Sequence, residues 1–130
     1  MSDSPYTVVN LKKVEDLAPK FGYTPNLESR FARRALELEN SGLSYFRLGP
    51  GFRVPFGHTH EQQEEIYLVV SGSARMKLDD EIVELNAWDA IRVAPEIARA
   101  SEAGPNGAEI VVFGAPHVED SHMLPEFWQD

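Results

Sequence analysis

Residues 57–72 read Gly-His-Thr-His-Glu-Gln-Gln-Glu-Glu-Ile-Tyr-Leu-Val-Val-Ser-Gly, and this stretch decides the fold. Side chains alternate between the two faces of a strand, so His58 and His60 are expected on the same face. Two imidazoles on one face can begin a metal site, and a nearby carboxylate can complete three ligands. The run after Glu65 is rich in β-forming residues, which predicts a strand that ends in a turn at Gly72.

The spacing leaves the identity of the carboxylate open. Glu64 and Glu65 both lie at a suitable sequence distance from His60. Glu65 shares strand parity with Tyr67, and a carboxylate at the entry of a buried strand is unfavourable without a partner. We therefore favour Glu65 as the ligand and Glu64 as its solvated neighbour. The alternative interpretation is that the acidic residues merely form a solvated turn.

Short segments rich in β-forming residues recur after residue 42 and are separated by turn residues. They cover residues 43–48, 52–60, 65–70, 74–78, 82–85, 90–93 and 109–113. Many short strands at regular spacing are typical of an all-β sandwich or barrel.

The residues before this β-rich part give weaker signals. Residues 6–10 predict a short strand, and residues 14–18 predict a helical turn that stops at Pro19. We expect an N-terminal extension that packs on the barrel, then the barrel, then a C-terminal tail. The boundaries we assign to these parts are residues 1–29, 30–115 and 116–130.

A helix is predicted at the start of the barrel. Thr24 can serve as its N-cap with Pro25 at the first helical position. Apolar residues then follow at helical spacing, and Gly42 marks where the helix must have ended. These apolar residues are Leu27, Phe31, Ala35 and Leu38. The alternative is a strand over residues 35–39 that turns at residues 40–42.

Composition argues against several classes of function. The 130 residues suffice for one domain with a single core. A net charge of −9 argues against nucleic acid and against an anionic membrane surface as partners. The absence of cysteine excludes disulfides and thiolate ligands. The sequence shows no 18-residue apolar run and no basic segment followed by an apolar one, so we expect a cytoplasmic protein.

The stretch around His58 resembles the first motif of the cupin superfamily, which reads His-x-His, three or four residues, Glu, six residues, Gly. His58, His60, Glu65 and Gly72 fit the version with four intervening residues. The resemblance covers most of residues 43–113 and implies an antiparallel cupin barrel, also called a double-stranded β-helix or jelly roll. Together with the segment before it, this gives an all-β fold with a short N-terminal helix. The resemblance also implies a homodimer.

The second cupin motif, Gly, five residues, Pro-x-Gly, two residues, His, is degraded in residues 88–99. Asp89 and Pro95 are kept, but Trp88 stands where the glycine would be. Arg99 stands where the family has its fourth metal ligand, a histidine. Arginine has no lone pair to give and stays protonated, and its charge repels a divalent cation.

Two states of the site follow from this substitution. In the first, His58, His60 and Glu65 hold one divalent transition metal (Fe, Mn, Ni, Cu or Zn), as in the facial triad of non-haem iron oxygenases. Arg99 then binds a substrate carboxylate, and Tyr67 acts as a catalytic proton shuttle. In the second, no metal binds and Arg99 pairs with Glu65 in place of the cation. A surface position for Arg99, outside the cavity, is a further alternative.

These two states predict different functions, and both involve a small polar or anionic molecule. The first predicts a metal-dependent enzyme, such as an oxygenase or isomerase, and the second a metal-free domain that binds or senses its ligand. A third hypothesis is a structural protein with a vestigial site. In the tail, His117 and His122 are expected to be solvated. The apolar residues 123–128 are expected to dock on the barrel.

Overall fold

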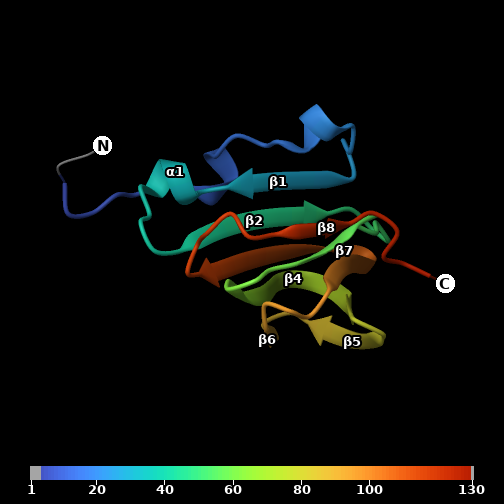
Figure 1. Ribbon diagram of the computed structural model, residues 1–130. Helices are drawn as coiled ribbons and strands as arrows, with labels where there is room; N and C mark the ends of the chain where they lie inside the picture. The colour runs from blue at the N-terminus through green and yellow to red at the C-terminus, as the bar shows by residue number, and fades with distance from the viewer. Residues whose placement is uncertain (1–3, 130) are drawn as a thin grey trace.

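The computed structural model describes residues 4–129, and the fold within them is a curled antiparallel sheet with almost no helix. The strands of the sheet are shown in Figure 1. They are β1 (Leu27–Phe31), β2 (Gly42–Leu48), β3 (Gly57–Thr59), β4 (Glu64–Leu78), β5 (Glu81–Asn86), β6 (Ala90–Val93), β7 (Arg99–Ala115) and β8 (His122–Leu124). The helical elements are α1 (Arg33–Leu36) and two 3₁₀ turns, Leu11–Lys13 and Ala18–Phe21. The predicted all-β cupin-type fold is confirmed.

Two long strands, β4 and β7, organise the sheet. One path through it runs β1-β2-β7-β3-β8, and β4 pairs with β5, β6 and β7. β4 and β7 pair over most of their length, with register shifts between Val69 and Ser71 and between Gly72 and Ala74. Such irregularities bend strands, which lets one sheet curl around an interior. In Figure 1, β1 lies at one side of the molecule and β5 and β6 lie at the other.

Gly72, the last residue of the first motif, is required by the backbone. Its φ is +73°, a left-handed conformation that side chains rarely adopt. A Cβ at this position would lie 2.0 Å from the carbonyl oxygen of Gly107. The turn predicted at this position is not formed, because β4 continues through Gly72 to Leu78. The glycine instead permits the irregularity in β4 and its close approach to β7.

The prediction of a helix over residues 27–38 is wrong. Residues 27–31 form β1, which pairs with β2, and helix is limited to the single turn α1. Leu27 and Ser29 are buried on one face, so the segment follows a period of two. Leu27 and Phe31 are four residues apart, a spacing that suits a helix face and a strand face equally. The alternative strand over residues 35–39 is not formed either.

The N-terminal segment before β1 also differs from expectation. Residues 6–10 form no strand, and the helical turn expected at residues 14–18 is not formed. Two 3₁₀ turns flank residues 14–17 instead, and Pro19 lies inside the second of them. The Asp16 carboxylate accepts the backbone N–H groups of Ala18 and Ser29, both at 2.9 Å. The segment thereby lies along the outer edge of β1, which would otherwise present unpaired backbone groups.

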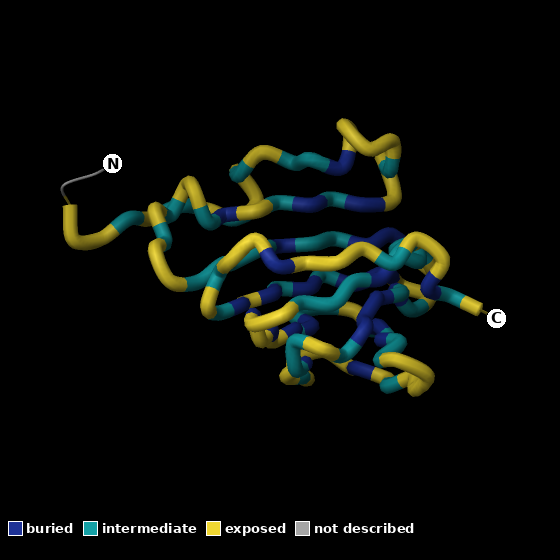
Figure 2. The backbone as a smooth tube through the Cα atoms, in the orientation of Figure 1, coloured by how far each residue is buried: buried dark blue, intermediate teal, exposed yellow. Residues whose placement is uncertain are grey.

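The tail docks on the barrel, as expected. β8 pairs with β3, and the Trp128 indole N–H donates to the Val54 carbonyl at 2.7 Å. Phe127 is buried against Ala98 and Ala100. Figure 2 shows buried positions alternating along the strands and exposed positions concentrated in the turns and the N-terminal segment. Within residues 4–129, no helix is long and apolar enough to cross a membrane.

Candidate metal and small-molecule site

The curled sheet encloses a cavity of about 820 Å³. Its wall consists of the inward side chains of β1, β2, β4 and β7, and the segment around β3 and the tail complete it. Much of this wall is apolar, with Leu48, Val54, Ile110 and Val112 among its residues. An apolar cavity with a few convergent polar groups is typical of a small-molecule site.

His58, His60 and Glu65 meet on the cavity wall. His58 lies in β3, His60 follows it, and Glu65 is the second residue of β4. One ligand atom from each lies within 4.8 Å of the others. The Nε2 atoms of both histidines are 3.5 Å from Glu65 Oε1. Glu65 lines the cavity whereas Glu64 is exposed, so the choice between these two carboxylates is settled in favour of Glu65 as the inward residue.

Glu65 is buried but well partnered. Its Oε1 accepts from Arg99 Nη1 at 2.7 Å and from the Tyr67 hydroxyl at 2.8 Å. Its Oε2 accepts from Gln63 Nε2 at 3.1 Å. Burial raises the pKa of Glu65, but hydrogen bonds from His58 and Tyr67 and the nearby histidine charges outweigh it and lower the pKa to about 2. The carboxylate is therefore ionised at neutral pH.

Arg99 is fully buried in the site, so the surface interpretation of this residue is wrong. Besides Glu65, its guanidinium donates to three backbone carbonyls, through Nε to Ile97 at 2.8 Å and through Nη2 to Ala94 and Pro95 at 2.7 and 3.3 Å. All three nitrogens thus already bind protein oxygens. A role in binding a substrate carboxylate stays a prediction and requires the exchange of one of these contacts.

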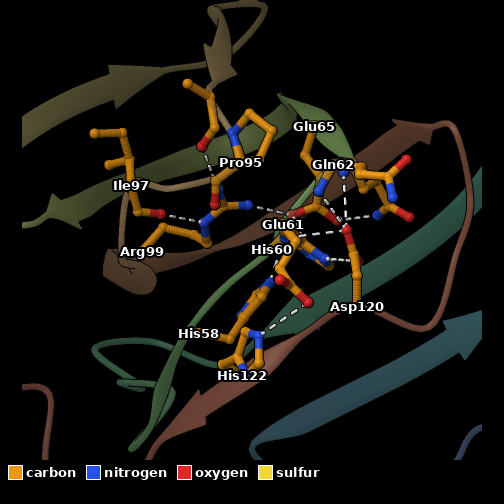
Figure 3. A network of polar contacts seen from close by, with 12 residues as sticks. His58, His60, Glu61, Gln62, Glu65, Pro95, Ile97, Arg99, Asp120 and His122 are labelled. Atoms are coloured by element: carbon orange, nitrogen blue, oxygen red, sulfur yellow. Dashed lines mark hydrogen bonds and ion pairs between the residues drawn. The ribbon is translucent and has the colours of Figure 1, made fainter.

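Asp120 in the tail is a site residue that the sequence did not reveal. Its Oδ1 lies 2.8 Å from His60 Nδ1, and its Oδ2 accepts the backbone N–H groups of residues 61–63 at 2.6–3.0 Å. In Figure 3, Asp120 approaches His60 from one side and Arg99 approaches Glu65 from the other. Burial raises the pKa of Asp120, but the hydrogen bonds to residue 62 and to His60 hold it well below its usual value.

The contact with Asp120 places a proton on one ring nitrogen of His60. An ionised carboxylate only accepts hydrogen bonds, so Nδ1 carries a proton. In the neutral ring Nε2 then has its lone pair free, and this buried atom has no hydrogen-bond partner among the described residues. A histidine held by a carboxylate at one nitrogen, with the other directed at further ligands, is the arrangement found at metal centres. This donor set fits a divalent transition metal, although the charge of Arg99 opposes one.

Tyr67 is placed to donate a hydrogen bond. Burial, followed by the Glu65 charge, raises the pKa of its phenol far above the usual value. The hydroxyl therefore stays protonated at neutral pH. Its role as a catalytic proton shuttle stays a prediction.

The two tail histidines differ. His122 is exposed and lies 3.4 Å from Glu61, as expected of a solvated residue. The expectation for His117 is wrong, because this residue is half-buried, lines the cavity and has a buried Nδ1. It does not belong to the three-residue ligand group.

Comparison of the whole fold with solved structures finds many matches, whereas no family model and no curated sequence matches the chain. A cupin protein from Bacteroides fragilis has 25% sequence identity and a TM-score of 0.72, over 89% of this chain and 88% of that one. Pac13, a nucleoside dehydratase from Streptomyces, has 18% identity and a TM-score of 0.71, over 98% and 95%. An oxalate oxidase in complex with glycolate has 13% identity and a TM-score of 0.67, over 88% and 61%.

The sheet topology, the position of Gly72 and these matches agree. The chain has the double-stranded β-helix fold of the cupin proteins to which it is similar.

Proposed function

We propose that this protein binds a small organic anion beside a divalent transition metal held by His58, His60 and Glu65. The observation that supports it most is His60 Nε2, a buried nitrogen that has no hydrogen-bond partner within residues 4–129 and lies close to the other two candidate ligands. A buried polar atom is rarely left unpaired without a functional reason.

The charges around the site favour an anionic ligand. Glu65 and Asp120 contribute two buried negative charges and Arg99 one positive charge. A divalent metal would leave the site with one net positive charge, and a monoanion would neutralise it. Because uncompensated charge is unfavourable in a buried site, the metal and the anion should stabilise one another.

This arrangement suits metal-dependent catalysis of the oxygenase or isomerase type. When bound, the metal would supply Lewis-acid polarisation of a substrate oxygen. Asp120 would hold the ring of His60, and Arg99 would balance the charge of Glu65. Tyr67 would present its proton to the cavity. Two structural neighbours support a small polar ligand, because one is described with glycolate and the other with uridine.

A metal-free binding site is the second candidate, and one contact favours it. The Arg99 guanidinium lies 2.7 Å from Glu65 Oε1, where it occupies the place of a cation. In this state the histidines would serve as hydrogen-bond donors and acceptors to the ligand.

Elemental analysis of the purified, untagged protein separates the two candidates. His58→Ala and His60→Ala would be measured beside His122→Ala, which removes an exposed histidine outside the ligand group. About one equivalent of metal in the wild type and in His122→Ala, lost in the other two, is the expected result. Absence of metal after reconstitution, or full occupancy in both site variants, would reject the metal site.

We also propose that the protein forms a homodimer through the outer face of β4 and β7. Ile66 and Phe113 are neighbours across these strands, point away from the cavity and are 39% and 43% exposed. Leu68 and Val111 continue this apolar face. Light scattering of Phe113→Glu, with Phe21→Glu as an exposed control, should show loss of the dimer only in the first variant. A wild-type monomer at micromolar concentration would reject the proposal.

A further inference from the structure

The cavity contains several polar atoms that the protein itself leaves unpaired. Among residues 4–129, four buried side-chain atoms have no hydrogen-bond partner: Arg33 Nε, His60 Nε2, Gln63 Oε1 and His117 Nδ1. All four residues line the same cavity. Each unpaired buried atom is destabilising, so a set of them around one cavity indicates a ligand that satisfies them.

Two of these residues, Gln63 and His117, lie with Glu65 in one row across the sheet. Gly42 pairs with Gly114, and Gly114 pairs with Glu65. The missing side chains of the two glycines make room for polar groups from elsewhere. A Cβ on Gly42 would lie 3.0 Å from His117 Nδ1, and a Cβ on Gly114 would lie 2.5 Å from Gln63 Nε2.

The row therefore has His117 at one end, Gln63 in the middle and Glu65 at the other end. Neighbouring strands lie about 5 Å apart, so the row spans roughly 10 Å. Gln63 connects its two ends, because its Nε2 donates to Glu65 while its Oε1 has no hydrogen-bond partner in the described part of the chain.

Arg33 adds a positive charge at the His117 end. It begins α1 directly after β1, and the preceding residue, Ala32, donates its N–H to the Leu43 carbonyl beside Gly42. Its Nη2 makes a long contact of 3.5 Å with the Glu39 carbonyl. Glu119 also lines the cavity here, but it is exposed, so solvent screens its charge.

We propose that the cavity binds an elongated organic acid with an anionic group at each end. One carboxylate lies at His58, His60 and Glu65, and this inner end rests on the function proposed above. The second lies at Arg33 and His117, where charge-assisted hydrogen bonds would satisfy the unpaired nitrogens. Gln63 Oε1 accepts a hydrogen bond from a hydroxyl or N–H group between them. The second anion subsite thus makes dicarboxylates the favoured ligand class.

Calorimetric titration with matched acids tests this subsite. Glutarate and adipate would be compared with pentanoate and hexanoate, which have the same numbers of carbons and one carboxylate fewer. We expect the dicarboxylates to bind at least about tenfold more tightly, the effect of one good charge-assisted contact. Equal affinity of the two series, or no binding of any of the four acids to the wild type, would overturn the proposal.

Neighbouring residues provide matched variants. Arg33→Gln should abolish the preference for dicarboxylates, whereas Arg34→Gln removes the same charge at the next, exposed position and should retain it. His117→Gln should weaken the preference and His122→Gln should not. Melting temperatures confirm that each variant folds. The same preference in Arg33→Gln and Arg34→Gln would reject the subsite.

Metal content shows whether a negative result rejects the second anion subsite or the proposed metal site. Arg33→Gln should keep the metal content of the wild type, because Arg33 lies outside the ligand group. A preference for dicarboxylates in a metal-free protein would support the subsite and reject the metal. Bound metal without that preference would reject the subsite alone.

Discussion

The two motif regions of the chain, residues 57–72 and 88–99, lie beside each other at the site but have kept different features. The first has its candidate metal-ligand residues and the glycine that its positive φ favours. The second has lost its glycine and histidine, yet Trp88 has a left-handed φ of +73° and Arg99 reaches Glu65. Backbone shape can thus persist after the residues that favour it are replaced, because the pairing of β4 with β6 maintains it.

The largest expected effect comes from breaking the Arg99–Glu65 contact that joins the two regions. Arg99→Met leaves Glu65 buried without its cation and should lower the free energy of unfolding by about 3–5 kcal/mol. Urea denaturation measures this, with Arg92→Met as a control at an exposed position. The double variant Arg99→Met, Glu65→Gln should recover part of the loss. A change below about 1 kcal/mol, the value of a surface pair, would contradict the description of this ion pair.

Acid should weaken the first region through Glu65. Its pKa is lowered from 4.5 to about 2, so its contribution to stability is fully present above pH 4.5 and is lost as the pH falls towards 2. In metal-free protein this contribution is of the order of 3 kcal/mol. Urea denaturation between pH 5.5 and 2.5 should show a smaller loss for Glu65→Gln than for the exposed control Glu64→Gln. Equal losses in the two variants would exclude this assignment.

Replacing Arg99 with the histidine of the cupin motif should let residues 88–99 contribute a metal ligand, as residues 57–72 are proposed to do. Arg99→His removes the opposing charge and adds a fourth donor, so zinc affinity should increase at least about tenfold. Competition with a chromophoric chelator measures the dissociation constant. Arg99→Gln, which removes the charge without a donor, separates the two contributions. If neither variant binds zinc more tightly, Arg99 does not limit metal binding.

Removing the negative charge of Asp120, which holds the ring of His60, should reduce metal affinity without removing a proposed ligand. Asp120→Asn should lower zinc affinity by about 10–100-fold, the usual effect of losing the carboxylate partner of a ligating histidine. Glu119→Gln, which removes the same charge at the preceding, exposed residue, should leave affinity unchanged. Circular dichroism should confirm that the barrel remains folded in both. Unchanged affinity in Asp120→Asn would show that the contact is only structural.

The smallest expected effect concerns the turn that has lost its glycine. Trp88→Gly should increase the free energy of unfolding by about 1 kcal/mol, because glycine adopts a positive φ without steric strain. Trp88→Ala keeps the strain and removes the exposed indole, so it should not stabilise the protein. Thermal and urea unfolding of the two variants give the difference. Equal stability of the two would indicate that φ at this position carries no penalty.

Features set by neighbouring residues could be predicted from the sequence, whereas features set by distant residues could not. The convergence of His58, His60 and Glu65 could be predicted because they lie within eight residues, and strand parity alone makes Glu65 rather than Glu64 the inward carboxylate. Leu27–Phe31 was predicted as a helix because its spacing fits two periods, and pairing with β2 decides between them. Asp120 could not be predicted, because the rule that a ligating histidine needs a partner does not say which distant carboxylate supplies it.

The contact between His60 and Asp120 has a consequence for the order of folding. It joins residues sixty positions apart, so a large loop must close before the imidazole is held in place. Pairs with such long loops form late, after the hairpins of β4, β5 and β6 have made their local contacts. A growing chain would therefore complete most of its barrel before its histidine ring is locked. Competence to bind metal would then report that the last strand has reached its place.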